Sequence, residues 1–142
     1  MRQFLERMCR PEWNRRILTQ ADFERFCLED KILVREAAIE ARGAYVAVDG
    51  LRVIFLSSRI VGVEKLIIEF HELGHAWLHV PNLKLYRGMF HRIQQQANIV
   101  SACALVPSYL LDEMSEQEIC ESFGYPQDLV RFRFLVRQFL GL

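Results

Sequence analysis

The sequence predicts an α+β fold in which a small antiparallel sheet with a β-hairpin packs against helices. Two runs rich in β-forming residues, 44–48 and 51–56, are separated by Asp49-Gly50. Asp-Gly is a favoured two-residue hairpin turn because both of its residues must adopt positive φ. Helical patterns with capping residues stand on both sides of this pair. The 142 residues have the length of one ordinary domain, so we expect a single domain over 1–142.

Two helices are predicted within residues 1–30. The first is a short amphipathic segment at 2–9 that ends before Pro11. The second begins at Thr19, where the letters TQAD resemble a capping box, and runs to about Asp30.

The small sheet is expected within residues 31–60. The hairpin strands are indicated by the pattern above, but residues 32–42 leave two alternatives open. Alanine and glutamate favour a helix there, whereas the length of the segment and the neighbouring pattern allow a strand.

A long helix is predicted to follow the sheet. Ser57 or Ser58 can cap it, and it runs from about Val63 to Val80, where Pro81 stops it. A second long helix is predicted at 91–106, ending before a proline. These two helices, within 63–106, carry the residues that suggest chemistry.

The C-terminal part, residues 115–140, is also expected to be helical. The letters SEQE at its start form a capping box that opens one helix, and Gly124 closes it. Pro126 suits the first turn of a final helix that runs to about Leu140.

Composition excludes several classes of function. Lys+Arg and Asp+Glu both number 18, so the net charge gives no support for direct binding of nucleic acid. Phe132, Phe134, Leu135 and Phe139 are expected in the core, which argues against a DNA-binding helix-turn-helix at the C-terminal end. No run is apolar enough for a membrane span or an export signal. We therefore expect a cytoplasmic protein with no membrane partner and with reduced cysteines.

The motif HELGH at residues 71–75 has the spacing of a zinc site. Residues four apart lie on one face of a helix, so His71 and His75 can bind one zinc ion with nitrogen atoms about 2.0–2.1 Å from it. Glu72 lies about 100° around the helix from His71. From there it can accept a proton from a water molecule that the zinc ion acidifies. Gly74 leaves room for the close approach of another segment or of a substrate.

HExxH also occurs by chance, in which case the two histidines and the glutamate simply stand on a partly exposed helix. The apolar context LIIEFHELGHAWLH favours a metal, because unpaired polar groups are costly to bury. His79 is too far along the helix to share a metal with His71, so we expect it to pack or to support a ligand.

Several segments together resemble the ImmA/IrrE-type metallopeptidases. FHELGHAWLH and the later QQQANIVSACALVPSYLL are similar to that family's HELGH helix and to its helix Glu-x-x-Ala-Asn-x-Phe-Ala-x-x-Leu-Leu-x-Pro. GAYVAVDGLRVIFLSS resembles the preceding strand pair, and SEQEICESFGYPQDLVRFRFLVRQF resembles the C-terminal helices, so residues 40–137 are covered. The resemblance implies a zincin-like metallopeptidase domain. In that family the two histidines and the glutamate of the later helix bind Zn²⁺, and Glu72 corresponds to the catalytic base.

The chain departs from the family pattern at the third ligand. Aligning Ala97-Asn98 places Gln94 where the family has glutamate. A glutamine amide oxygen can contact zinc but carries no charge, and zinc sites ordinarily use Cys, His, Asp or Glu. His91 lies one turn earlier on the same helix face and is an alternative third ligand. A water molecule in that position, or no stable zinc, is the remaining alternative.

Two functions are consistent with these observations. The first is a zinc-dependent endopeptidase with a narrow protein substrate. The resemblance implies that this substrate is a helix-turn-helix transcriptional repressor in a stress or mobile-element regulatory system. The second is a catalytically impaired, zincin-like binding module that holds a protein partner without cutting it, because Gln94 replaces glutamate.

Overall fold

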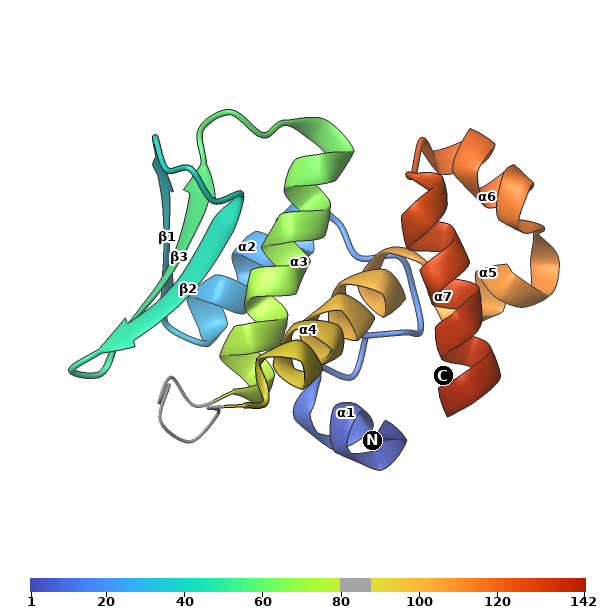
Figure 1. Cartoon of the computed structure of the whole chain (residues 1–142), viewed down its shortest axis with the longest axis horizontal. Coiled ribbons are helices and arrows are strands. Elements are labelled where there is room, and N and C mark those ends of the chain that lie inside the picture. The colour runs from blue at the N-terminus through green and yellow to red at the C-terminus, as the bar shows by residue number, and fades with distance from the viewer. Residues whose placement is uncertain (80–87) are drawn as a thin grey trace. The chain divides into compact units, whose positions relative to one another are not determined.

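The computed structural model describes residues 1–79 and 88–142, and these ranges form seven helices and a three-stranded sheet (Figure 1). The predicted α+β class is therefore confirmed. In chain order the elements are α1 (Arg2–Met8), α2 (Gln20–Glu29), β1 (Ile32–Ala37), β2 (Gly43–Val48), β3 (Leu51–Ser57), α3 (Gly62–Leu78), α4 (Phe90–Leu105), α5 (Ser108–Glu113), α6 (Glu116–Phe123) and α7 (Gln127–Leu140).

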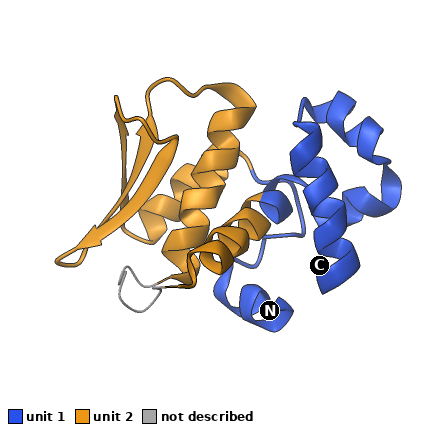
Figure 2. Ribbon diagram, viewed as in Figure 1, with its two compact units in different colours: residues 1–18, 102–142 blue, residues 19–101 orange. Residues whose placement is uncertain are grey.

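The chain divides into two compact units (Figure 2). Residues 19–101 form one unit, which contains the sheet, α2, α3 and most of α4. Residues 1–18 and 102–142 form the other. In the described part of the chain, none of the helices is both long enough and apolar enough to cross a membrane.

The sheet has the strand order β1-β3-β2 and is mixed. β2 pairs with β3 in antiparallel fashion, and Asp49 and Gly50 between them have φ of 51° and 79°, which confirms the predicted hairpin turn. β1 runs parallel to β3, so the prediction of a wholly antiparallel sheet is wrong. The reason is topological: β3 inserts between β1 and β2, which run in opposite directions, and therefore has to be parallel to one of them. Of the ambiguous residues 32–42, the first six form strand β1.

The core of the sheet-containing unit lies between the sheet and the helices α2 and α3 (Figure 1). α2 contacts β1, while α3 contacts β2, β3 and α2. Ile54 and Leu56 alternate along β3 on the side that faces the helices and are almost fully buried. Phe23 of α2 and Phe70 of α3 meet edge to face, with ring centroids 6.0 Å apart. This packing fixes α3, the helix that carries HELGH, against the sheet.

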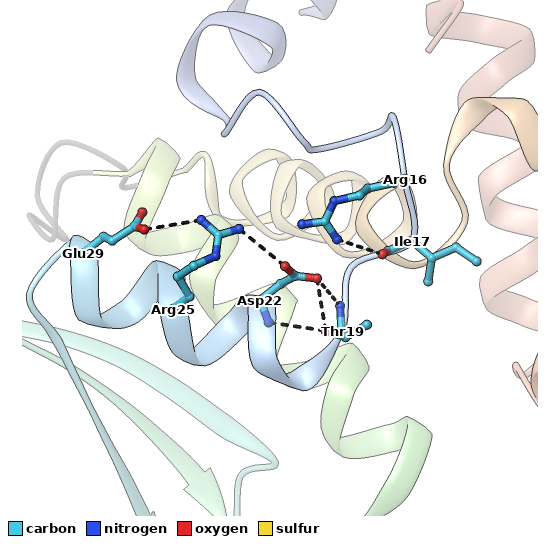
Figure 3. Close-up of polar contacts among 6 residues, drawn as sticks. All are labelled: Arg16, Ile17, Thr19, Asp22, Arg25 and Glu29. Atoms are coloured by element: carbon cyan, nitrogen blue, oxygen red, sulfur yellow. Dashed lines mark hydrogen bonds and ion pairs between the residues drawn. The ribbon is translucent and has the colours of Figure 1, made fainter.

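α2 begins at the predicted capping box (Figure 3). The Thr19 hydroxyl accepts a hydrogen bond from the backbone N–H of Asp22 at 3.4 Å, and the Asp22 carboxylate accepts one from the backbone N–H of Thr19 at 2.8 Å. Arg25 then forms ion pairs with Asp22 and Glu29, at 3.4 and 3.3 Å. The two capping hydrogen bonds satisfy backbone N–H groups at the start of the helix, where N–H groups have no partner within the helix.

The start of α3 differs from the prediction. The serine pair at 57–58 does not cap the helix, whose N-cap is Val61 and makes no side-chain hydrogen bond there. The hydroxyl of the first serine instead accepts a hydrogen bond from the backbone N–H of Arg59, at 3.3 Å, and so closes a turn before the helix. The helix ends at Leu78. The expected end at residues 80–81 lies outside the described residues.

The last turn of α3 is attached to the sheet by Arg52 of β3. Its Nη2 donates to the carbonyl oxygen of Ala76 at 2.8 Å, its Nη1 to the carbonyl oxygen of Asp30 at 3.0 Å, and its Nε to the Tyr45 hydroxyl at 3.0 Å. Trp77 Nε1 donates to the Asp30 carboxylate at 2.9 Å. Arg52 thus satisfies a carbonyl that the C-terminal end of a helix leaves free.

In the second unit the predicted boundaries of α6 and α7 are confirmed, whereas helix α5 was not predicted. Ser115 and Glu118 form the capping box of α6, and Gly124 ends that helix in the left-handed conformation with φ of 68°. Pro126 is the N-cap of α7.

The buried side of α7 differs from the prediction. α7 buries Val130, Arg133 and Val136, whereas Leu135 and Phe139, which we expected in the core, are 45% and 75% exposed.

Candidate metal centre

The structure brings the two histidines of HELGH together with Gln94 of α4. His71 Nε2 lies 2.9 Å from Gln94 Oε1, and His75 Nε2 lies 3.2 Å from His71 Nε2 and 3.3 Å from Gln94 Oε1. We call these three atoms the donor triangle. Around a tetrahedral zinc ion with ligands 2.0–2.1 Å away, two ligand atoms stand about 3.3–3.4 Å apart. The donor triangle therefore has close to the separations of three ligands on one ion.

Close packing of α3 on α4 explains why Gln94 reaches the histidines. A Cβ atom added at Gly74 would lie 3.0 Å from Val100 Cβ and 3.2 Å from Ala97 Cα, so glycine lets the two helices approach. Ser101 Oγ of α4 donates to the carbonyl oxygen of Ile67 in α3 at 2.8 Å. The expectation that Gly74 permits the close approach of another segment is confirmed.

Glu72 lies on the side of α3 that faces β2. It is 7% exposed, its carboxylate accepts a hydrogen bond from the backbone N–H of Tyr45, and a Cβ at Gly43 would lie 3.1 Å from its Cγ. Burial raises the pKa of Glu72 to about 7, although the hydrogen bond from Tyr45 acts in the opposite direction. A carboxyl group with a pKa near neutrality can both accept and release a proton under ordinary conditions.

His79, the C-cap residue of α3, contacts His75 on the side away from the donor triangle. Its Nδ1 lies 3.0 Å from His75 Nδ1, and its Nε2 lies 2.9 Å from Gln96 Oε1. It therefore touches a candidate ligand, and its nitrogen atoms are not part of the donor triangle.

Burial favours the neutral form of the three histidines on α3 and its C-cap. Burial lowers the pKa of His71 and of His79. Burial, with the neighbouring imidazoles as a smaller cause, lowers the pKa of His75 to about 4. Neutral imidazole is the form that binds metal ions, so no proton has to be removed from an imidazolium before binding.

His91, the alternative third ligand, is exposed on α4. Within residues 1–79 and 88–142, no group of three or more His, Cys, Asp or Glu side chains is placed to hold a metal ion. The side chain that completes the triangle is therefore the amide of Gln94.

The donor triangle fits a zinc ion in geometry and departs from common zinc sites in charge. Two imidazole nitrogens converge with one oxygen at ligand-like separations. Common zinc sites of this spacing use an anionic third ligand, and the amide of Gln94 is neutral. A divalent ion would therefore retain its full double charge in this site.

Sequence reasoning missed three contacts around the triangle. The backbone N–H of Tyr45, which donates to Glu72, is positioned by strand pairing, so no pattern of side chains in the sequence predicts this hydrogen bond. Gln96, which binds His79, looks like any polar residue on a helix surface. The side chain of Asn98 also forms a hydrogen bond with His71. Its spacing of four from Gln94 was the one signal available, because residues four apart share a helix face.

In comparisons with known proteins, no family model matched the chain and no curated protein matched it.

Proposed function

We propose that this chain is a zinc-dependent endopeptidase with a narrow protein substrate. The observation that carries the proposal is the donor triangle, formed by His71, His75 and Gln94 beside a buried glutamate. That glutamate, Glu72, has a pKa of about 7. The close packing at Gly74, which brings α4 to the histidines, supports the fit of the donor triangle to the HExxH arrangement.

The roles of the residues follow from their positions. His71, His75 and Gln94 would hold the ion, which when bound acidifies a water molecule and polarises the scissile carbonyl group. The Glu72 carboxylate accepts a proton as the carbonyl carbon is attacked and then delivers it to the leaving amine. The backbone N–H of Tyr45 donates a hydrogen bond to that carboxylate.

The nature of the substrate is proposed from the resemblance to ImmA/IrrE-type metallopeptidases. On that basis we propose a helix-turn-helix transcriptional repressor, in a stress or mobile-element regulatory system, as the protein that is cleaved. Membrane and nucleic-acid partners have no place in this proposal, and the cytoplasm is the proposed compartment.

The test compares the zinc-loaded wild-type chain with Glu72→Gln on a library of peptides made from a whole proteome, with cleavage read by mass spectrometry. We expect cleavages by the wild type that disappear with Glu72→Gln, while the variant still binds zinc. Glu64→Gln is the matched control, because Glu64 lies on the same helix but is exposed. Cleavage that persists in Glu72→Gln would remove Glu72 from the mechanism.

The neutral Gln94 favours a second candidate, a catalytically impaired binding module that holds a protein partner. This candidate predicts no cleavage dependent on Glu72 in the peptide library. It also predicts that a purified repressor binds the wild type and Glu72→Gln equally, with or without added zinc. Loss of binding on removal of zinc would contradict it.

A further inference from the structure

A line of contacts runs from the donor triangle to the surface of α4. His75 uses Nε2 in the triangle and Nδ1 toward His79, with the two Nδ1 atoms 3.0 Å apart. His79 in turn places Nε2 2.9 Å from Gln96 Oε1. His75 and His79 therefore each use both ring nitrogens, one toward the preceding neighbour in the line and one toward the next.

The positions of the protons follow from the end of this line. The amide oxygen of Gln96 can only accept, so Nε2 of His79 must carry the proton of that ring. A neutral imidazole has one N–H, which leaves Nδ1 of His79 as an acceptor. The bond between the two rings then requires Nδ1 of His75 to be the donor. Nε2 of His75 is left with an unprotonated lone pair that faces the triangle.

The other end of the line is compatible with the same arrangement. The shortest distance in the triangle, 2.9 Å, joins His71 Nε2 to Gln94 Oε1, and the oxygen can only accept. Without a metal, the proton between them therefore belongs to His71, and it also faces Nε2 of His75 at 3.2 Å. An acceptor at Nε2 of His75 is compatible with that proton. The longer separation of 3.3 Å between His75 Nε2 and Gln94 Oε1 then joins two acceptors and is not a hydrogen bond in the metal-free chain.

We infer that His79 and Gln96 are positioning residues that set the tautomer of His75, holding its proton on Nδ1 and keeping Nε2 available to a divalent cation. This inference rests on the proposed function for its purpose, although the tautomer itself is a property of the metal-free chain. Partners of this kind, on the far nitrogen of a metal-binding histidine, are typically worth about 10–100-fold in metal affinity. Here the partner of His75 is the imidazole of His79, which is itself oriented by the amide of Gln96. We call this line of contacts from Gln96 through His79 to His75 the relay.

The first test is long-range ¹H–¹⁵N NMR of the imidazole rings in the metal-free protein, which contains four histidines. We expect His75 to show the pattern of the Nδ1–H tautomer and His79 that of the Nε2–H tautomer. His91, which is exposed, provides the reference for an imidazole in solvent. An Nε2–H tautomer at His75 in the wild-type protein overturns the inference.

The second test uses variants of α4 and competition with a zinc chelator. Gln96→Leu removes the acceptor and is expected to lower zinc affinity about 10-fold or more and to mix the tautomers of His75. Gln96→Glu keeps an acceptor and should retain both properties. Gln95→Leu is the matched control, since Gln95 is the exposed neighbour on the same helix. Unchanged tautomers in Gln96→Leu contradict the relay.

The two tests separate the relay from the proposed function. If the NMR pattern is as expected but wild type binds no zinc, the relay stands and the peptidase proposal fails. If zinc binds and peptides are cleaved while His75 carries its proton on Nε2 in the metal-free chain, the peptidase proposal stands and the relay fails.

Discussion

Gln94 Oε1 lies 2.9 Å from His71 Nε2, although the two residues are 23 positions apart and on different helices. The oxygen thus occupies the third corner of the donor triangle, where the proposed function places a third zinc ligand. A glutamate carboxylate has the same length and would reach the same point. The difference between the two residues is one negative charge.

Gln94→Glu is expected to raise zinc affinity by at least about 10-fold, because it supplies the anionic third ligand of zinc sites built from two histidines and one glutamate. The measurement is competition with a chromogenic chelator. His91→Ala should leave the affinity unchanged, since His91 is exposed. If His91→Ala lowers the affinity and Gln94→Glu does not alter it, the third ligand is His91.

Gly74→Ala is expected to lower the free energy of unfolding by about 1 kcal/mol, although alanine is the better helix former. The new Cβ would stand 3.0 Å from Val100 Cβ and 3.2 Å from Ala97 Cα, and neither atom can move without moving α4. Displacing α4 also moves Gln94, so zinc affinity should fall as well. Urea unfolding and chelator competition measure the two effects, and a more stable variant with full affinity would contradict the packing argument.

Arg52→Ala is expected to lower the free energy of unfolding by about 2–4 kcal/mol, because two backbone carbonyl groups and the Tyr45 hydroxyl lose a charged donor. Arg59→Ala is the control, since Arg59 is exposed and makes one long contact of 3.4 Å to a carbonyl oxygen. It should change the stability by less than about 0.5 kcal/mol. Equal effects of the two substitutions, measured in urea, would show that the attachment of α3 by Arg52 contributes nothing.

Glu69 should make stability depend on pH. It is 0% exposed, its Oε2 accepts a 2.7 Å hydrogen bond from Gln20 Nε2, and burial raises its pKa above the usual 4.5. Because the folded pKa is the higher one, the unfolded chain loses this proton first as the pH rises. The contribution of Glu69 to stability is therefore fully present below about pH 4.5 and is lost as the pH rises through the folded pKa.

Glu69→Gln cannot ionise, so the wild type should lose stability relative to this variant as the pH rises from 4.5. Urea unfolding of both proteins at several pH values, with a chelator present, measures the difference between their slopes. Parallel curves would mean that Glu69 titrates normally in the folded chain.

The parts of the fold that the sequence predicted correctly depend on short-range contacts. Thr19 and Ser115 form capping boxes with residues three positions later, and the turn at Asp49-Gly50 depends on the conformations of those two residues alone. Gly124 ends its helix for the same local reason. Each of these signals is complete within four residues, so tertiary structure had nothing to add.

The predictions that were wrong or absent depend on distant parts of the chain. The parallel pairing of β1 with β3 requires knowing which strand inserts between the other two. An arginine in a helix is ordinarily expected on the surface, yet Arg133 is 0% exposed, because its guanidinium donates to the backbone oxygens of Val106 and Leu142 and to Asn14 Oδ1. A pattern of hydrophobicity has no means of recording such partners.

The candidate site shows the same division. The sequence predicted the pairing of His71 with His75 from their spacing and the position of Gln94 from its alignment. The structure brings all three side chains together. The contacts of His79 with His75 and Gln96 depend on the register of α4 against α3, which no short motif specifies.

None of the three atoms in the donor triangle carries a formal negative charge. For nitrogen and oxygen donors, affinity for first-row divalent ions rises along the Irving–Williams series to copper(II) and falls again at zinc. Thiolates or a complete set of four protein ligands would counter that ranking, and three neutral donors do not. The identity of an ion bound at the proposed site is therefore expected to follow the free concentrations of copper and zinc that the chain meets as it folds, which would make metallation depend on cellular metal homeostasis as much as on the protein.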